Sequence, residues 1–352
     1  MNEREHFLLL DGLRGVAALA VVWYHLHFVV GYDDAGPLAV DLFFMLSGFV
    51  IAAAYDQRLD RDLSVLMFMK RRYVRLYPMF FAGLVVALMV QQVLIAFSAG
   101  ALDERQTLYS FVIEAFWLPS PFNGGTGWTF PLNGPAWSLS LEIVANLLFA
   151  VFHRRLSDGV LAGVVAISAI AILWDVLDIG TINNGWSWAT LPFGVARVGY
   201  AFPLGVLMYR RRDLIPVSIG RLPPWLPLVA LAFVLFLPEM RAIDLIFLTI
   251  GAPLLIATGF RTTITGHAIP YRRLGDISYP IYAVHGSLVL LVQGATTRLK
   301  LEAIGPIIGL VSLAGLAILS LILARWELSA REWLTRRLIP RRLRAHAAQP
   351  TG

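Results

Sequence analysis

The sequence predicts an all-α polytopic membrane protein with ten transmembrane helices and both termini in the cytoplasm. Three observations predict this fold class. The chain of 352 residues is 58% hydrophobic and only 15% charged, which lies outside the range of ordinary soluble domains. It contains repeated apolar runs close to the roughly 20 residues that a helix needs to cross a bilayer. Its Lys and Arg residues are concentrated in alternate connecting segments.

Ten apolar runs follow one another along the chain, and each is predicted to form a membrane-spanning helix. These runs are residues 8–31, 38–55, 76–99, 134–152, 158–179, 187–209, 224–240, 242–260, 275–296 and 304–325. The boundary between the seventh and eighth runs is the least marked, because only Pro238 to Arg241 separate them. The shorter apolar stretch 108–118 is predicted to be an interfacial or re-entrant helix.

The basic residues predict the orientation of these helices. If the N-terminus is cytoplasmic, 23 of the 29 Lys and Arg residues lie in cytoplasmic segments and 4 lie outside. The other two, Arg14 and Arg197, lie within spans. Such a bias is typical of proteins with both termini inside. The net charge of +6 therefore reflects topology and attraction to anionic membrane lipids, and nucleic acid is excluded as a partner.

The composition also excludes several kinds of site. The chain has no cysteine, so disulfides, thiolate metal sites and thiol nucleophiles are excluded. No pair of histidines has metal-ligand spacing on one helix face, so no metal site is predicted. The chain is divided into a transmembrane domain, residues 1–335, and a basic tail, residues 336–352, which is expected to be disordered and non-catalytic.

The first apolar run carries ionisable groups that are costly in lipid. Asp11, Arg14 and His25 lie inside it. A charge at bilayer depth costs at least about 2.5–3.5 kcal/mol, so such a group usually faces protein or water and has a function. Arg14 and His25 are eleven residues apart, which places them about 16 Å apart on one face of a helix. The alternative is that Asp11 and Arg14 form an interfacial anchor and His25 is a hydrogen-bonded core group.

Two acidic residues in other runs are candidates to assist His25. His25 and Glu142 are each predicted to lie about 9–10 Å below the outer surface, with Asp41 slightly shallower. A carboxylate at the same depth can fix the tautomer of an imidazole and stabilise its protonated form. We therefore expect Glu142, or less strongly Asp41, to orient His25. The alternative for Glu142 is a structural hydrogen bond to a neighbouring helix.

A basic cluster precedes the third run. Arg71, Arg72 and Arg75 lie at its cytoplasmic end, and Arg72 and Arg75 are at i, i+3 on one helical face. Arginine offers bidentate contacts to phosphate, so a phosphorylated donor entering from the cytoplasm would meet these charges first. The alternative is that the cluster only anchors the span and sets its orientation.

Five segments in order carry a family resemblance. DGLRGVAALAVVWYH, DLFFMLSGFVIA, RRYVRLYP, PAWSLSLEI and LGDISYPIYAVH together cover essentially the whole chain. They resemble the acyltransferase-3 family, membrane O-acyltransferases that modify bacterial surface glycans, lipopolysaccharide and some small molecules. The R-x10-H arrangement of the family corresponds to Arg14 and His25. Two features differ: Ile143 stands where many relatives have an acidic or bulky polar residue, and no SGNH hydrolase-like domain follows the last run.

The resemblance implies an enzyme of the bacterial inner membrane that uses acyl-CoA, most simply acetyl-CoA, as donor. The phosphates would bind near Arg71, Arg72 and Arg75, and the pantetheine arm would pass Arg14. His25 would deprotonate a hydroxyl of a glycan, a glycolipid or another acceptor. Direct attack by this hydroxyl and transfer through an acyl-histidine both remain open.

Several further residues are candidates on the same basis. Ser47, Trp137, Ser138 and Arg14 are candidate donors to the thioester oxyanion. Ser47, Tyr279 and His285 are assigned to the donor site, and Trp137, Ser138, Trp128 and Asn133 to the acceptor site. For Tyr279 and His285 the alternative is an aromatic packing stripe, and for the loop 119–133 it is an interfacial tryptophan belt. Arg197 is a mid-span cation whose partner the sequence does not identify.

Two other function classes remain. Intramembrane Arg, His and Glu residues also suit the proton relay of a secondary transporter. Transporters often show inverted repeats with paired broken helices, and the sequence shows no such pairing. The third class is a non-catalytic scaffold that binds lipid or glycan. Release of free thiol from an acyl-CoA only in the presence of an acceptor would identify the enzyme.

Overall fold

The computed structural model describes residues 7–32, 34–97, 100–264 and 266–340, and nearly all of its regular structure is helical. No β-strand occurs in the described part of the chain; two isolated bridges join Asp34 to Pro238 and Trp128 to Ser187. The α-helices are α1 (Leu8–His25), α2 (His27–Val30), α3 (Leu38–Arg61), α4 (Val65–Ala96), α5 (Glu104–Glu114), α6 (Ala136–Phe152), α7 (Asp158–Ile179), α8 (Leu191–Arg210), α9 (Leu226–Leu235), α10 (Arg241–Ile246), α11 (Ala252–Arg261), α12 (Ile269–Leu299) and α13 (Gly305–Leu338).

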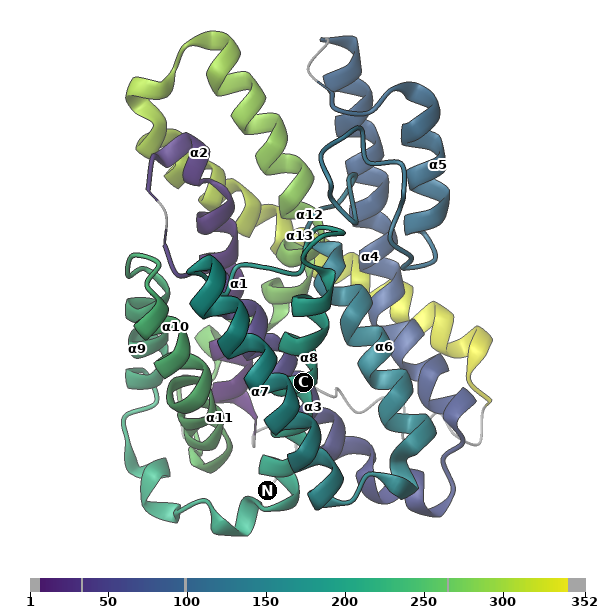
Figure 1. The fold of residues 1–352 in the computed structure, drawn as a ribbon, viewed down its shortest axis with the longest axis vertical. Coiled ribbons are helices and arrows are strands. Elements are labelled where there is room, and N and C mark those ends of the chain that lie inside the picture. The colour runs from purple at the N-terminus through teal and green to yellow at the C-terminus, as the bar shows by residue number, and fades with distance from the viewer. Residues whose placement is uncertain (1–6, 33, 98–99, 265, 341–352) are drawn as a thin grey trace.

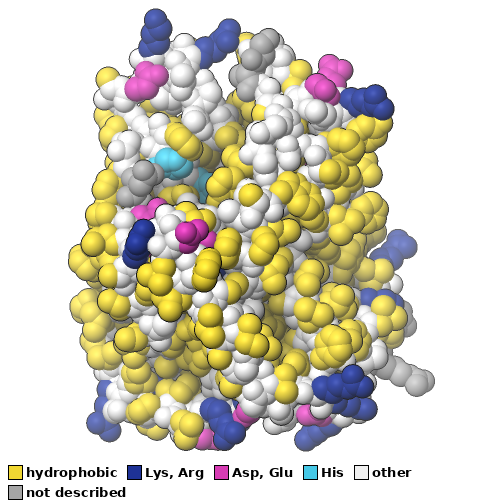
Figure 2. All heavy atoms as spheres, viewed as in Figure 1, with side chains coloured by type: hydrophobic (Ala, Val, Ile, Leu, Met, Phe, Trp, Pro, Cys, Tyr) yellow, Lys and Arg dark blue, Asp and Glu magenta, His cyan; other side chains and the backbone are white. Residues whose placement is uncertain are grey.

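Each predicted apolar run coincides with helix, but the structure supports fewer spans than ten. Among the described residues, eight helical segments are long and apolar enough to cross a membrane. The other two predicted spans correspond to α9, which has only ten residues, and to α12, which has 31 residues but is too polar to qualify. Figure 2 shows hydrophobic side chains over the middle of one face of the molecule and most charged side chains towards its two ends. The orientation of the termini remains a prediction.

Several helices extend beyond the predicted boundaries, and α4 and α13 do so by the most. α4 begins at Val65, eleven residues before the predicted start at 76, and the Ser64 side chain caps it by accepting a hydrogen bond from the backbone N–H of Met67. The arginine cluster is therefore helical and lies within α4. α13 continues to Leu338, past the predicted start of the tail at 336. Residues 341–352 of that predicted tail lie outside the described residues.

Glycines bring the central helices into backbone contact. A Cβ atom at Gly48 of α3 would lie 2.0 Å from the carbonyl oxygen of Phe202 in α8, and one at Gly205 would lie 2.0 Å from that of Met45. A Cβ at Gly15 of α1 would likewise meet the backbone of α12 at Leu274. Small residues allow this close approach in membrane proteins, where packing drives helix association. α1, α3, α8 and α12 thereby form the centre of the bundle (Figure 1).

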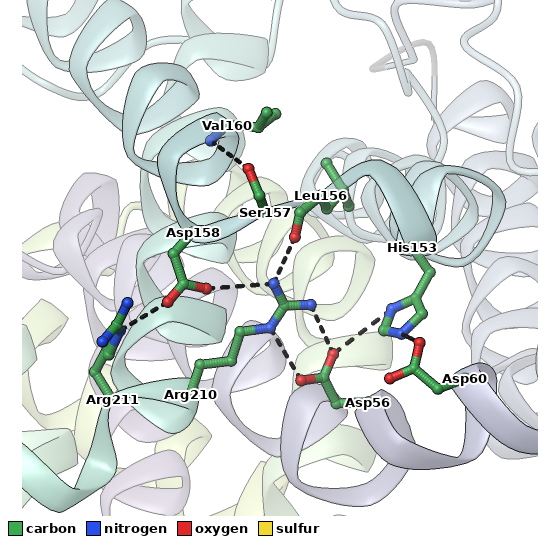
Figure 3. Close-up of polar contacts among 9 residues, drawn as sticks. All are labelled: Asp56, Asp60, His153, Leu156, Ser157, Asp158, Val160, Arg210 and Arg211. Carbon is green, nitrogen blue, oxygen red and sulfur yellow. Dashed lines mark hydrogen bonds and ion pairs between the residues drawn. The ribbon is translucent and has the colours of Figure 1, made fainter.

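An ion-pair network joins the ends of α3, α7 and α8 (Figure 3). Arg210 donates two hydrogen bonds to the carboxylate of Asp56, at 2.9 and 2.8 Å, and a third to the carbonyl oxygen of Leu156. His153, which follows α6, lies between Asp56 and Asp60, 3.0 Å from the latter. The sequence indicated these basic residues only as topology signals, and the structure shows that they also hold the helix ends together.

Candidate active site

A cavity lies between α1, α3, α4, α6 and α12 and encloses about 940 Å³ of empty space, including its open part. Most of the side chains around it are apolar. Its charged lining consists of three arginines and two carboxylates: Arg14, Arg72, Arg75, Asp11 and Glu142. These residues come from three different helices, so Arg14 of α1 and two arginines of α4 lie around the same cavity. The cavity therefore has a small excess of positive charge within an apolar bundle.

Arg14 is held at the cavity by two partners. Its guanidinium donates to Asp11, one turn earlier on α1, at 3.0 Å and to the hydroxyl of Ser278 on α12, also at 3.0 Å. The ion pair is partly exposed within the cavity. The Asp11–Arg14 pair that the sequence offered as an alternative does form, and it lies in the wall of the cavity.

Glu142 has different partners from those predicted. Its carboxylate accepts a hydrogen bond of 2.6 Å from Ser47 on α3 and one of 3.2 Å from Arg72 on α4. The expectation that Glu142 contacts His25 is therefore wrong for this structure. The two residues have similar predicted depths in the membrane but differ in the direction in which they point. Glu142 faces the cavity, whereas His25 does not line it. Ser47 lines the cavity, and its hydroxyl donates to Glu142.

Asp41 also binds an arginine and not His25. It accepts two hydrogen bonds from Arg197 on α8, at 3.0 and 2.7 Å, and both side chains are buried. The carbonyl oxygens of Asn184 and Pro37 accept the other hydrogen bonds of this guanidinium. Trp137 packs with its ring centroid 5.5 Å from the guanidinium carbon. Asp41 and Trp137 do not line the cavity, in contrast to the roles predicted for them.

The three arginines of α4 differ in their surroundings. Arg72 and Arg75, which share one face of the helix, line the cavity, whereas Arg71 does not. Arg71 and Arg72 are buried, so they do not form the exposed entrance that the sequence suggested. Among the described residues, Arg75 makes no hydrogen bond or ion pair. Arg75 is thus the cavity arginine whose donors remain available to an anion.

His25 lies at the end of α1, about 16 Å from Arg14 along the helix axis. Its Nδ1 is 2.8 Å from the carbonyl oxygen of Val21. Its ring lies edge to face with that of His285 on α12, with centroids 4.9 Å apart. His285 is fully buried and does not line the cavity, so the expectation that it lines the donor tunnel is wrong for this structure. Tyr279 does line the cavity, and its hydroxyl donates to the carbonyl oxygen of Leu76.

Tyr282 connects the cavity to the two histidines. It lines the cavity, and its ring lies 5.6 Å from that of His285. Its hydroxyl is 2.5 Å from that of Ser138 and 3.2 Å from the carbonyl oxygen of Pro135, and its ring packs against Phe43. Ser138 also lines the cavity. The cavity therefore ends at Tyr282 and Ser138, and the histidine pair lies beyond them.

The loop between α5 and α6 is held by a buried carboxylate at the end of α5, which the sequence did not indicate as a site residue. Glu114 at the end of α5 accepts hydrogen bonds from the backbone N–H groups of Leu132 and Asn133. Burial without a cationic partner raises the pKa of Glu114 to about 8. The isolated acidic residue in the apolar stretch 108–118 was the available signal.

The predicted acceptor residues of this loop are in different environments. Asn133 is buried, and its amide donates to the carbonyl oxygen of Ala283 on α12, so it is not part of a surface platform as predicted. Trp128 is half-buried, and its ring packs at 6.2 Å against that of Trp186. Trp186 and the nearby Trp188 are exposed. Aromatic side chains therefore gather at this loop, as the sequence suggested.

Comparison with known proteins adds a family to this geometry. The profile of an acyltransferase domain matches residues 7–326. The "Protein 2 in picA locus" of Rhizobium radiobacter is 36% identical over 48% of this chain and 94% of its own length. The putative peptidoglycan O-acetyltransferase YrhL of Bacillus subtilis is 26% identical over 80% of this chain and 48% of its own. The peptidoglycan O-acetyltransferase OatA of Listeria monocytogenes is 29% identical over 42% of this chain, and the matched part is 24% of OatA. No solved structure matches the chain significantly.

Proposed function

The chain belongs to the acyltransferase-3 family of membrane O-acyltransferases, and on that premise we propose that it moves an acyl group from cytoplasmic acyl-CoA to a hydroxyl of a glycan or glycolipid. The observation that carries the proposal is the cavity, in which three arginines and a fixed carboxylate lie inside an apolar bundle. Intramembrane arginines that face a cavity usually mark a substrate path. Two relatives are named peptidoglycan O-acetyltransferases, which favours acetyl as the acyl group and an enzyme over a transporter.

The cavity suits the chemistry of a nucleotide thioester. A phosphate binds well to a guanidinium, which offers two parallel donors, and Arg75 has its donors available. Arg14 can also contact the donor, because Asp11 and Ser278 use only part of its five N–H donors. Arg72 holds Glu142 and so contributes charge more than direct contact. The apolar remainder of the lining suits the pantetheine arm and a short acyl chain.

His25 is the proposed general base. The carbonyl oxygen of Val21 only accepts hydrogen bonds, so Nδ1 of His25 carries its hydrogen and Nε2 is left with a lone pair. Nε2 takes the proton of the acceptor hydroxyl while the oxygen of that hydroxyl attacks the thioester carbonyl. The C–S bond then breaks, and the proton passes to the thiolate, which leaves as free CoA. Transfer through an acyl-histidine follows the same proton balance in two steps.

The reaction requires a connection between the cavity and His25. The cavity ends at Tyr282 and Ser138, whose hydroxyl groups are hydrogen-bonded to each other. Rotation of the Tyr282 side chain would break this contact and join the cavity to the space beside His25. We assign Tyr282 and Ser138 to the passage of the donor on this basis.

The test is acyl transfer in open membrane fragments from cells that express the chain, with radiolabelled acetyl-CoA as the probe. His25→Ala is expected to lower incorporation of label into glycan and lipid by about 10²–10⁴-fold, the usual contribution of a general base. His267→Asn, a change at an exposed histidine, is the control and should leave incorporation unchanged. A folded His25→Ala protein with near-normal incorporation would refute the role of His25. Counter-ion-driven uptake into sealed vesicles without release of thiol would refute the enzyme.

A further inference from the structure

His285 is a fully buried histidine with one nitrogen unused. Its Nδ1 lies 2.9 Å from the carbonyl oxygen of Tyr282 and 3.2 Å from that of Ile281. Carbonyl oxygens only accept hydrogen bonds, so Nδ1 carries the hydrogen. Nε2 then bears a lone pair, and it is buried without any hydrogen-bond partner. Nearly all buried polar atoms in proteins are satisfied, so an exception of this kind needs an explanation.

The neighbouring imidazole is in the same state. The Nδ1 of His25 is committed to the carbonyl oxygen of Val21, which leaves its Nε2 as an acceptor as well. The two rings are in direct contact, with centroids 4.9 Å apart and planes at 72°. Two neutral rings in these tautomers cannot hydrogen-bond through Nε2, because neither has a hydrogen to donate there. With one additional proton, the protonated Nε2 of one ring can donate to the Nε2 of the other once the side chains turn these two atoms towards each other.

In the described structure His25 has a hydrogen bond to Val21 and ring contacts with Tyr24 and His285. Tyr24 contacts its ring at 5.3 Å, and Tyr282 contacts His285 at 5.6 Å. His27, which lies close to His25, has its own Nδ1 against the carbonyl oxygen of Tyr24. The carboxylates of Asp41 and Glu142 are bound to arginines. Within the described residues, neither histidine ring has an ion pair.

We propose that His285 is the positioning residue of the proposed base, and that the pair holds between its two Nε2 atoms the proton that His25 removes from the acceptor hydroxyl. The inference rests on the proposed function. In the transfer step the acceptor oxygen forms the new ester bond and its proton moves to Nε2 of His25, where His285 accepts a hydrogen bond from it. When the C–S bond breaks, this proton leaves the pair and neutralises the thiolate. No other reactant is required.

Two matched substitutions separate this role from a structural one. His285→Asn places an amide where Nδ1 lies, so it keeps the local hydrogen bond to the helix and removes Nε2. His285→Gln reaches the position of Nε2 and can still accept a hydrogen bond from His25. Acyl transfer from radiolabelled acetyl-CoA is measured in open membrane fragments, with initial rates over a range of acetyl-CoA concentrations and with His267→Asn as the control.

His285→Asn is expected to lower kcat about tenfold to a hundredfold with little change in the KM for acetyl-CoA, because the hydrogen bond that stabilises protonated His25 is lost. His285→Gln is expected to recover much of this loss. In a His25→Ala background, His285→Asn should cause no further decrease. Equal loss in both variants, or a rise in KM with kcat unchanged, would overturn the proposal and favour a packing or donor-binding role. If His25→Ala itself retains activity, the proposed function fails before this inference is reached.

Discussion

Loss of the Arg197 guanidinium would leave Asp41 as a buried charge without a partner. The Asp41 side chain has no exposed surface, and among the described residues its two oxygens accept hydrogen bonds only from Arg197. Removal of one member of a buried ion pair costs about 3–5 kcal/mol, because the other charge remains desolvated. Arg197→Met preserves much of the side-chain volume and the packing against Trp137. We therefore expect Arg197→Met to lower the free energy of unfolding by about 3–5 kcal/mol.

A double variant that removes both charges completes a double-mutant cycle. Asp41→Leu with Arg197→Met leaves no unpaired charge, so most of the loss should be recovered, since replacing a whole buried pair with apolar groups is often neutral. The assay is unfolding of the purified protein in detergent, followed by the fluorescence of its ten tryptophans, with exposed Arg221→Met as the control. A cost below about 1 kcal/mol for Arg197→Met would refute the reasoning. Retention of acyl transfer by the double variant would show that Asp41 supports the fold and not the chemistry.

Three further predictions concern Arg75, Glu114 and Arg210. Arg75→Gln should raise the KM for acetyl-CoA about tenfold to a hundredfold. The KM for S-acetyl-N-acetylcysteamine, which has no phosphate, should stay unchanged. Equal increases in the KM for both substrates would contradict a phosphate contact. Burial raises the pKa of Glu114 from 4.5 to about 8, so between these pH values the folded protein keeps a proton that the unfolded chain loses. The free energy of unfolding should therefore fall as the pH rises from about 4.5 to about 8. Glu114→Gln should remove this pH dependence, and a variant with the same pH profile as the unchanged protein would contradict the prediction. Arg210→Met should cost about 1.5–3 kcal/mol, whereas exposed Arg211→Met should cost less than about 1 kcal/mol, and similar losses in urea unfolding would contradict the network in Figure 3.

The positions of the helices could be predicted from sequence because the length of an apolar run is a local property. All ten predicted runs coincide with helix. Two of them do not qualify as spans, and the reasons are local: α9 is too short and α12 is too polar. The start of α4 was missed because KRRYVR was interpreted as the polar entrance to a span. Ser64, a residue type that favours helix N-caps, was a usable signal for the earlier start.

The partners of the buried charges could not be predicted in the same way. Depth in the membrane fixes one coordinate, whereas contact also depends on the rotation of each helix and on which helices are neighbours. Glu142 and His25 agree in predicted depth, but Glu142 turns towards α3 and α4. The sequence assigned Arg72 to the phosphates of the donor and gave no indication that it contacts Glu142. Asp41 and Arg197 are 156 residues apart in sequence, and only the packing of α3 against α8 brings them together.

These pairings restrict how His25 can function. An imidazole that takes a proton in an apolar bundle needs a group that stabilises the resulting charge. The sequence offered two carboxylates for that purpose, and the structure commits both to arginines. Transfer of Asp41 to His25 would leave Arg197 buried and unpaired, which carries the same cost as the loss of Asp41. The remaining neighbour with an unused acceptor is His285. A base assisted by a neutral acceptor is stabilised less than one assisted by a carboxylate, so its proton should pass readily to the departing thiolate, as the transfer step requires.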